Sequence, residues 1–273
     1  MKVNSWHISD PHLSFNAQGE VLKPMDQRTW SNGTSAYVGY LDKIKEFAAK
    51  NIRPHDFTYI TGDITHNFGA QGAVFCLKWL AENIPGIKVI CRGNHDKKWE
   101  VSKIRRKWSV PLDTYLIDEG EIISIGPYTI GCWSNHNTKT SDMNGIPDEQ
   151  TRLDYVGFAS DLAAQAARKE RTPIYLSHYP VLPNTAERIG EMGIKAYLSG
   201  HVHCTTNKNE GEDINGVYWG NYDKSAGLTD DKVFKGCFFS TGTTDVLLAK
   251  HKSIFKKIDC LSYKADKQSL REI

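Results

Sequence analysis

The hexapeptide Leu198-Ser199-Gly200-His201-Val202-His203 places two histidines two positions apart, directly after a short apolar run and a glycine. In extended or loop backbone, alternate residues point to the same side, so both imidazoles can face one pocket. Neutral imidazole is the commonest metal ligand near neutral pH. The pair alone fits two ordinary loop histidines equally well, and the rest of the chain decides between these interpretations.

Four earlier segments share one arrangement with this hexapeptide. In each, a short apolar run typical of a strand ends in a turn that carries a carboxylate, an amide or an imidazole. The polar residues at these four turns are Asp10 with His12, Asp63, Asn94 with His95 and Asp96, and His178. Loops at the carboxyl ends of parallel strands meet at one edge of a sheet. The segments therefore predict one site assembled from strand ends.

Strands and helices are expected to alternate along the first part of the chain. Apolar runs predict strands over 3–8, 57–61, 88–91, 174–176 and 196–198. Apolar residues at helical spacing predict helices over 36–50, 69–83, 155–168 and 184–192, the last with a capping box at Asn184 and Glu187. This alternation favours right-handed βαβ units and a largely parallel sheet.

The later part of the chain changes character. Two runs over 121–125 and 128–133, divided by Gly126-Pro127, predict a hairpin. Strand-like runs at 217–219, 237–240 and 245–249 predict a second, more antiparallel sheet. Because we find no repeat and no convincing linker, we expect a single domain over residues 1–273.

Composition narrows the class of protein. Of 273 residues, 40% are hydrophobic and 24% charged, and the net charge of +2 does not demand a nucleic-acid or membrane partner. The six cysteines form no C-x-x-C pair, which favours reduced thiols over a zinc ribbon. No apolar run has the length of a signal peptide or a membrane span. We expect a soluble, cytoplasmic protein.

The candidate ligands are carboxylate, imidazole and amide groups without a thiolate. Such a set suits manganese, iron, zinc or nickel and does not choose among them. Seven such ligands are too many for one tetrahedral site, but they fit two divalent metal ions if one carboxylate bridges the two ions. Two ions about 3.5–4 Å apart can deprotonate a water and hold the oxygens of a phosphoryl group.

The blocks around these residues resemble, in order and spacing, the five signature blocks of the calcineurin-like metallophosphoesterase superfamily. The resemblance covers about residues 3–203. It implies an α/β protein with a four-layer α/β/β/α sandwich of two mixed sheets, the metallo-dependent phosphatase fold, and a dimetal site at the strand ends. The metal ligands that it implies are Asp10, His12 and His203 for one ion, Asn94, His178 and His201 for the other, and Asp63 as the bridge.

The same resemblance implies two catalytic residues, His95 and Asp96. His95 would face the phosphate, stabilising its charge or protonating the leaving group. Asp96 would orient the loop or His95. The chain lacks the Asp-Arg-Gly and Gly-Asn-His-Glu blocks of the protein Ser/Thr phosphatases, which makes it more similar to the phosphodiesterase and small phosphohydrolase branches.

The function expected from this resemblance is hydrolysis of a phosphodiester, or of a phosphomonoester, in a nucleotide-like or other small substrate. The reaction would be an in-line attack of a metal-bound hydroxide, and the segments 15–34 and 134–154 would set specificity. One alternative is a nuclease that uses the basic stretch 97–107 on nucleic acid; the mild net charge argues against it. The other is a non-catalytic scaffold on the same fold.

Overall fold

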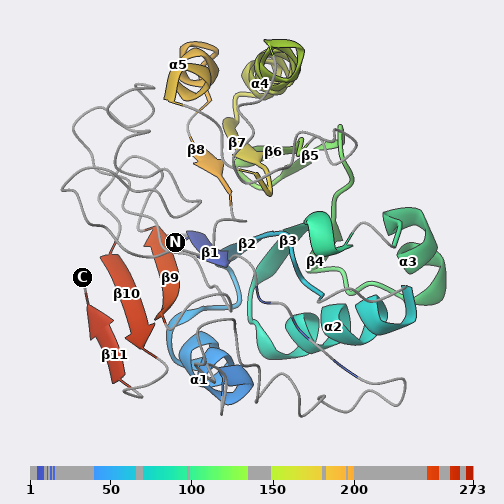
Figure 1. Cartoon of the computed structure of the whole chain (residues 1–273), viewed down its shortest axis with the longest axis vertical. Coiled ribbons are helices and arrows are strands. Elements are labelled where there is room, and N and C mark those ends of the chain that lie inside the picture. The colour runs from blue at the N-terminus through green and yellow to red at the C-terminus, as the bar shows by residue number, and fades with distance from the viewer. Residues whose placement is uncertain are drawn as a thin grey trace.

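Two β-sheets form the centre of the protein, flanked by helices (Figure 1). The computed structural model describes residues 5–8, 11, 13, 15, 40–65, 70–96, 99–134, 149–179, 183–194, 196–199, 245–251, 259–264 and 269–272. Both sheets contain parallel and antiparallel pairs, so both are mixed.

The larger sheet has seven strands in the order β11-β10-β9-β1-β2-β3-β4. Its parallel half consists of β1 (Ser5–Ile8), β2 (Phe57–Thr61), β3 (Ile87–Cys91) and β4 (Thr114–Leu116). Every residue of β1 and β2 is buried, as expected for parallel strands covered on both faces. The parallel βαβ arrangement predicted for this part of the chain is confirmed, although β4 was not foreseen.

The predicted second sheet of C-terminal strands is wrong. The strand β9 (Asp245–His251) pairs antiparallel with β1, and β10 (Asp259–Lys264) and β11 (Ser269–Glu272) continue the same sheet. An apolar run predicts a strand but not its partner, and β9 covers the ladder of β1 that would otherwise form an open edge. The runs at 217–219 and 237–240 lie outside the described residues.

The smaller sheet is built from the middle of the chain. Its order is β5 (Ile122–Ile125), β6 (Tyr128–Cys132), β7 (Thr172–Leu176) and β8 (Ala196–Leu198). The first two strands form the predicted hairpin, and β6, β7 and β8 run parallel.

Helices cover the outer sides of both sheets. In Figure 1, α1 (Tyr40–Asn51), α2 (Ala70–Asn83) and α3 (Val101–Lys107) lie with the larger sheet, and α4 (Glu149–Arg168) and α5 (Pro183–Glu191) lie with the smaller one. These helices confirm the predicted periodicities, and α4 begins earlier than its apolar stripe indicated. None of the helices that the structure describes is both long and apolar enough to cross a membrane.

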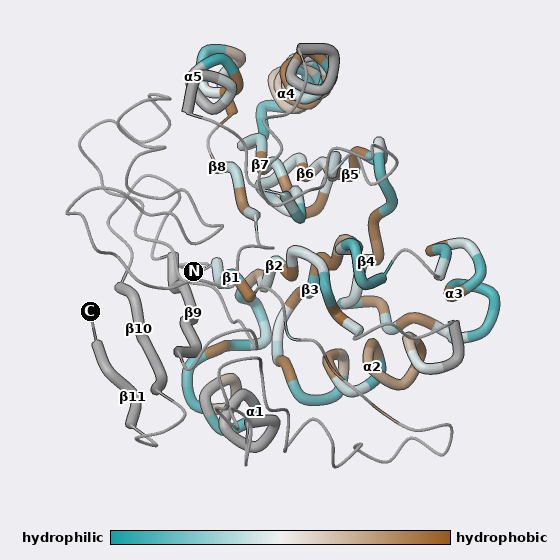
Figure 2. The backbone as a smooth tube through the Cα atoms, viewed as in Figure 1, coloured by the Kyte–Doolittle hydropathy of each residue, from teal (hydrophilic) through white to brown (hydrophobic). Residues whose placement is uncertain are grey.

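Three clusters of buried side chains hold these elements together. One joins β1 and β2 to α1, α2 and α3, and includes Trp6 and Leu77. The second joins strands of both sheets, and includes Tyr59 and Ile174. The third joins the smaller sheet to α4 and α5, and includes Tyr175. Figure 2 shows hydrophobic stretches along β3 and along α2, as this packing requires.

Candidate metal centre

Five of the nine predicted site residues belong to the described part of the chain, and the structure brings them together. Asp63 follows β2, the turn of Asn94, His95 and Asp96 follows β3, and His178 follows β7. These residues therefore lie at the carboxyl ends of strands from both sheets. The other predicted ligands lie outside the described residues: Asp10, His12, His201 and His203.

The imidazole of His178 is fixed by hydrogen bonding on one nitrogen. Its Nδ1 lies 3.0 Å from the carbonyl oxygen of Thr61. Because a carbonyl oxygen can only accept, Nδ1 carries the proton, and Nε2 of the neutral ring carries a lone pair. Nε2 lies 2.8 Å from Asn94 Oδ1 and 3.4 Å from Asp63 Oδ1. His178 and Asp63 are both buried.

This arrangement brings three electron-rich atoms to one point. A neutral imidazole nitrogen, an amide oxygen and a carboxylate oxygen cannot donate hydrogen bonds to one another, whereas a cation between them is attracted to all three. Metal-bound histidines typically donate their other ring N–H to a carbonyl or a carboxylate, as His178 does to Thr61. The residues present therefore fit a divalent metal ion with nitrogen and oxygen ligands.

The described side chains supply only part of a metal site. Within the portion of the chain that the structure describes, no three His, Cys, Asp or Glu side chains are grouped to hold a metal ion. The converging atoms include the amide of Asn94, and four further predicted ligands lie outside that portion.

The backbone around Asp63 is held in an uncommon conformation. Gly62 and Asp63 have φ angles of +86° and +47°, in the left-handed region, and outliers of this kind in non-glycine residues concentrate at functional sites. A side chain at Gly62 would place its Cβ 2.6 Å from His178 Nδ1. A Cβ at Gly93 would overlap the backbone nitrogen and Oδ1 of Asp63. Both glycines allow the two loops to approach closely.

His95 lies on the other side of the Asp63 carboxylate. Its backbone N–H donates to Asp63 Oδ1 at 2.9 Å, and its Nε2 lies 3.9 Å from Asp63 Oδ2. The side chain of His95 is 26% exposed, in contrast to the fully buried His178. A partly accessible imidazole beside the predicted bridging carboxylate can reach a bound ligand.

Asp96 points into the protein and joins two loops. Its Oδ1 accepts the backbone N–H and the hydroxyl of Thr65 at 2.8 and 2.9 Å, and its Oδ2 accepts the backbone N–H groups of Ile64 and Gly93 at 2.9 and 2.8 Å. Burial raises the pKa of this carboxyl, and the same hydrogen bonds lower it in part. These contacts support the loop-orienting role that the resemblance implies for Asp96.

Sequence reasoning missed two residues that hold His178. Thr61 contributes its carbonyl oxygen, and its hydroxyl lies 2.8 Å from Nε2 of the buried His7. Ser134, directly after the predicted strand 128–133, accepts the backbone N–H of His178 with its hydroxyl oxygen at 2.8 Å. The position of Ser134 at a strand end could have identified it, but a hydroxyl is not a typical ligand of the metals considered.

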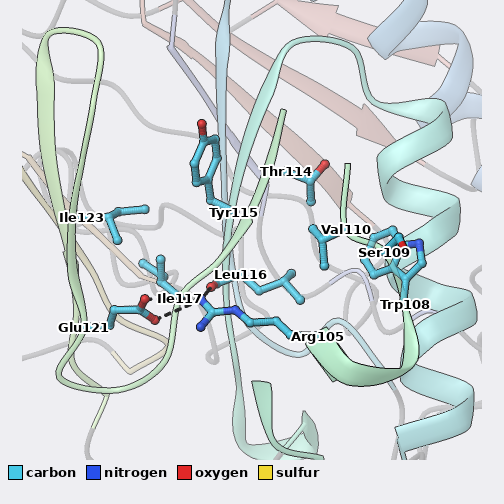
Figure 3. A pocket seen from close by; sticks show the side chains of 10 residues that line it. All are labelled: Arg105, Trp108, Ser109, Val110, Thr114, Tyr115, Leu116, Ile117, Glu121 and Ile123. Atoms are coloured by element: carbon cyan, nitrogen blue, oxygen red, sulfur yellow. Dashed lines mark hydrogen bonds and ion pairs between the residues drawn. The ribbon is translucent and has the colours of Figure 1, made fainter. Parts of the chain in front are cut away.

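A cavity of about 370 Å³ lies elsewhere, between α3, β4 and β5 (Figure 3). It is lined by Arg105, Trp108, Ser109, Val110, Thr114, Tyr115, Leu116, Ile117, Glu121 and Ile123. Arg105 contacts the Leu116 carbonyl oxygen and the Glu121 carboxylate across it. None of the five described site residues lines this cavity, so it is separate from the candidate metal centre.

Comparison with known proteins agrees with this geometry. The family model for calcineurin-like phosphoesterases matches residues 3–205, which include every predicted site residue. The chain belongs to the calcineurin-like phosphoesterase family. Members generally hydrolyse phosphoesters and bind two divalent metal ions, which supports a metal-dependent hydrolase.

The family assignment rests on that match. Among solved structures, the chain is similar to a protein of unknown function from Aquifex aeolicus, with 18% identity and a TM-score of 0.37, over 76% of this chain and 82% of that one. The search of curated proteins finds no match.

Proposed function

We propose that this calcineurin-like phosphoesterase hydrolyses phosphodiester bonds in a small, nucleotide-like substrate. The observation that carries the proposal is the convergence of Asn94 Oδ1, Asp63 Oδ1 and His178 Nε2 in a buried position at the strand ends. These residues follow the carboxyl ends of β2, β3 and β7, and ligands commonly bind at the carboxyl ends of parallel strands. Phosphoryl transfer requires mainly positioning and charge neutralisation, and this cluster supports both.

Two divalent ions would supply the positive charge that activates water and neutralises the phosphoryl oxygens. We propose that Asn94, His178 and His201 hold one ion, and that Asp63 is shared between the two. The residues proposed for the other ion are Asp10, His12 and His203. The donor types suit manganese, iron, zinc or nickel.

His95 is the proposed catalytic residue. Its backbone is anchored on Asp63 Oδ1, and its imidazole is the partly exposed one of the two described site histidines. From this position it would hydrogen-bond the phosphoryl group or give a proton to the leaving oxygen. We assign Asp96 to the same machinery as a positioning residue, because its four hydrogen bonds fix the loop that carries His95.

We also propose a layer arrangement and a domain organisation for the protein. The three buried clusters support a four-layer α/β/β/α sandwich, and we propose that residues 1–273 form a single domain. We also propose a cytoplasmic location, for which buried free thiols at Cys76, Cys91 and Cys132 are the expected state.

The basic helix α3 gives little support to the alternative function as a nuclease. Lys103 pairs with Glu100 at 2.7 Å, and Arg105 pairs with Glu121 at 3.3 Å. Two of its basic side chains are therefore partly neutralised, which weakens the case for a phosphate-binding surface on this helix. A small phosphate ester remains the partner that we propose.

A pair of aryl phosphates tests the proposal. Bis-p-nitrophenyl phosphate and p-nitrophenyl phosphate report diester and monoester hydrolysis by the release of nitrophenolate. We expect Mn²⁺-dependent turnover that a chelator abolishes, with the diester preferred. A rate on both esters that is unchanged after chelation would refute the metal-dependent reaction, and a clear monoester preference would refute the diester assignment alone.

A further inference from the structure

We propose that Ser134 is a positioning residue that holds the His178 metal ligand in place, a role that rests on the function proposed above. Ser134 is completely buried and is the second residue after β6. Its hydroxyl oxygen accepts the backbone N–H of His178, 44 positions later in the chain, at 2.8 Å. Ser134 therefore acts through the backbone of His178.

The hydrogen bond between Ser134 and His178 lies just beyond the last paired residues of β6 and β7. The register pairs Cys132 with Leu176, and beyond it the N–H of Trp133 donates to the Leu176 carbonyl oxygen at 3.1 Å. Beyond that point, the N–H of His178 donates to the side chain of Ser134. The two strands can therefore separate into loops while His178 remains tied to the sheet.

Ser134 is itself held from the opposite side. The hydroxyl of Tyr155, on α4, donates to the carbonyl oxygen of Ser134 at 3.1 Å. Tyr155 is buried, and burial raises the pKa of its phenol above the usual value, so the hydroxyl stays a donor at neutral pH. Ser134 therefore links α4 to the loop that follows β7 through two hydrogen bonds.

Hydrogen bonds constrain different parts of His178 and of the residue after it. Ser134 fixes its backbone nitrogen, and the Thr61 carbonyl oxygen fixes the rotation of its ring through Nδ1. The hydroxyl of Tyr197 donates to the carbonyl oxygen of the next residue, Tyr179, at 2.8 Å. The Ser134 contact joins a side chain directly to the backbone of His178. Its loss would leave a buried N–H without that acceptor and let Nε2 move away from Asn94 Oδ1.

The test compares three variants by Mn²⁺ binding rather than by turnover. Ser134→Ala removes the acceptor, and Ser134→Thr retains it. Thr129→Val is the matched control, because it also removes a buried hydroxyl, one that lies on β6 and contacts Ser124 at 3.2 Å. Equilibrium dialysis with metal analysis gives the number and affinity of the bound ions, and thermal unfolding without metal shows that each variant is folded.

We expect Ser134→Ala to bind one of its two Mn²⁺ ions about 10–100-fold more weakly, as is typical when a residue supporting a metal ligand is lost. Thr129→Val should bind both ions like the wild type, and Ser134→Thr should restore most of the lost affinity. Wild-type affinity in a folded Ser134→Ala variant would overturn the positioning role and leave the proposed function intact. A wild-type protein that binds no divalent metal would overturn both.

Discussion

Replacing Asp96 with asparagine isolates the contribution of one buried carboxylate to the loops of the site. Each carboxylate oxygen of Asp96 accepts two hydrogen bonds, one pair from Thr65 and the other from Ile64 and Gly93. An asparagine presents one oxygen and one NH₂ group. If the NH₂ group faces Ile64 and Gly93, both of their N–H groups lose an acceptor. If it faces Thr65, the threonine hydroxyl can turn and accept from the amide, so only the N–H of Thr65 loses its acceptor.

The magnitude follows from this count. A buried donor left without a partner costs about 1–3 kcal/mol, and the orientation toward Thr65 leaves one such donor. The variant also removes a buried negative charge, whose unfavourable burial is evident in the raised pKa of Asp96. This relief offsets part of the loss, and we expect Asp96→Asn to lower the free energy of unfolding by about 1–2 kcal/mol.

Urea unfolding at neutral pH in the presence of a chelator measures this change without a contribution from metal binding. Asp161→Asn on the exposed side of α4 is the matched control and should stay within about 0.5 kcal/mol of the wild type. If Asp96→Asn were as stable as this control, the carboxylate would not hold the two loops together, and our account of the turn after β3 would be wrong.

Three further predictions concern the site and the core. Asp63→Ala should lose both Mn²⁺ ions in a dialysis measurement and all measurable turnover, since its carboxylate is the proposed bridge; retention of two ions would contradict that role. His95→Ala should keep both ions and lose turnover about 10²–10⁴-fold on a diester with a poor leaving group, and an unchanged rate would exclude it from the reaction. Burial raises the pKa of Tyr59, Tyr128 and Tyr155, so these phenols stay neutral in the folded protein while the unfolded chain ionises near pH 10. Their contribution to stability is complete below about pH 10, so the free energy of unfolding should fall as the pH rises above about 10, less steeply in Tyr128→Phe. Ultraviolet absorbance showing that they ionise at about pH 10 in the folded protein would contradict this.

The strand-end pattern predicted more of this protein than any single motif. The runs before Asp63, Asn94 and His178 are strands of two sheets, and their carboxyl ends meet as expected. The prediction succeeded because a parallel strand buried on both faces is a continuous apolar run, and the following polar residue marks its end. The same pattern could not assign β9 to the larger sheet, because strand partners are not encoded locally.

Contacts between main chain and side chain were beyond sequence reasoning. The four donors to Asp96 include the backbone N–H groups of Ile64 and Thr65, which lie 32 and 31 positions away. Because every residue except proline has such a group, the residue types at these positions do not reveal the contact. The support of His178 by Thr61 depends on a carbonyl oxygen, and the left-handed φ of Asp63 follows from the approach of two loops. Each feature exists only once the strands have paired.

Metal location tests the central claim most directly. Crystals grown with Mn²⁺ give anomalous difference peaks that place each ion without reference to activity. We predict two peaks about 3.5–4 Å apart, with Asp63 between them and with Asn94 and His178 bound to the same ion. A single ion, or a pair remote from Asp63, would contradict the account.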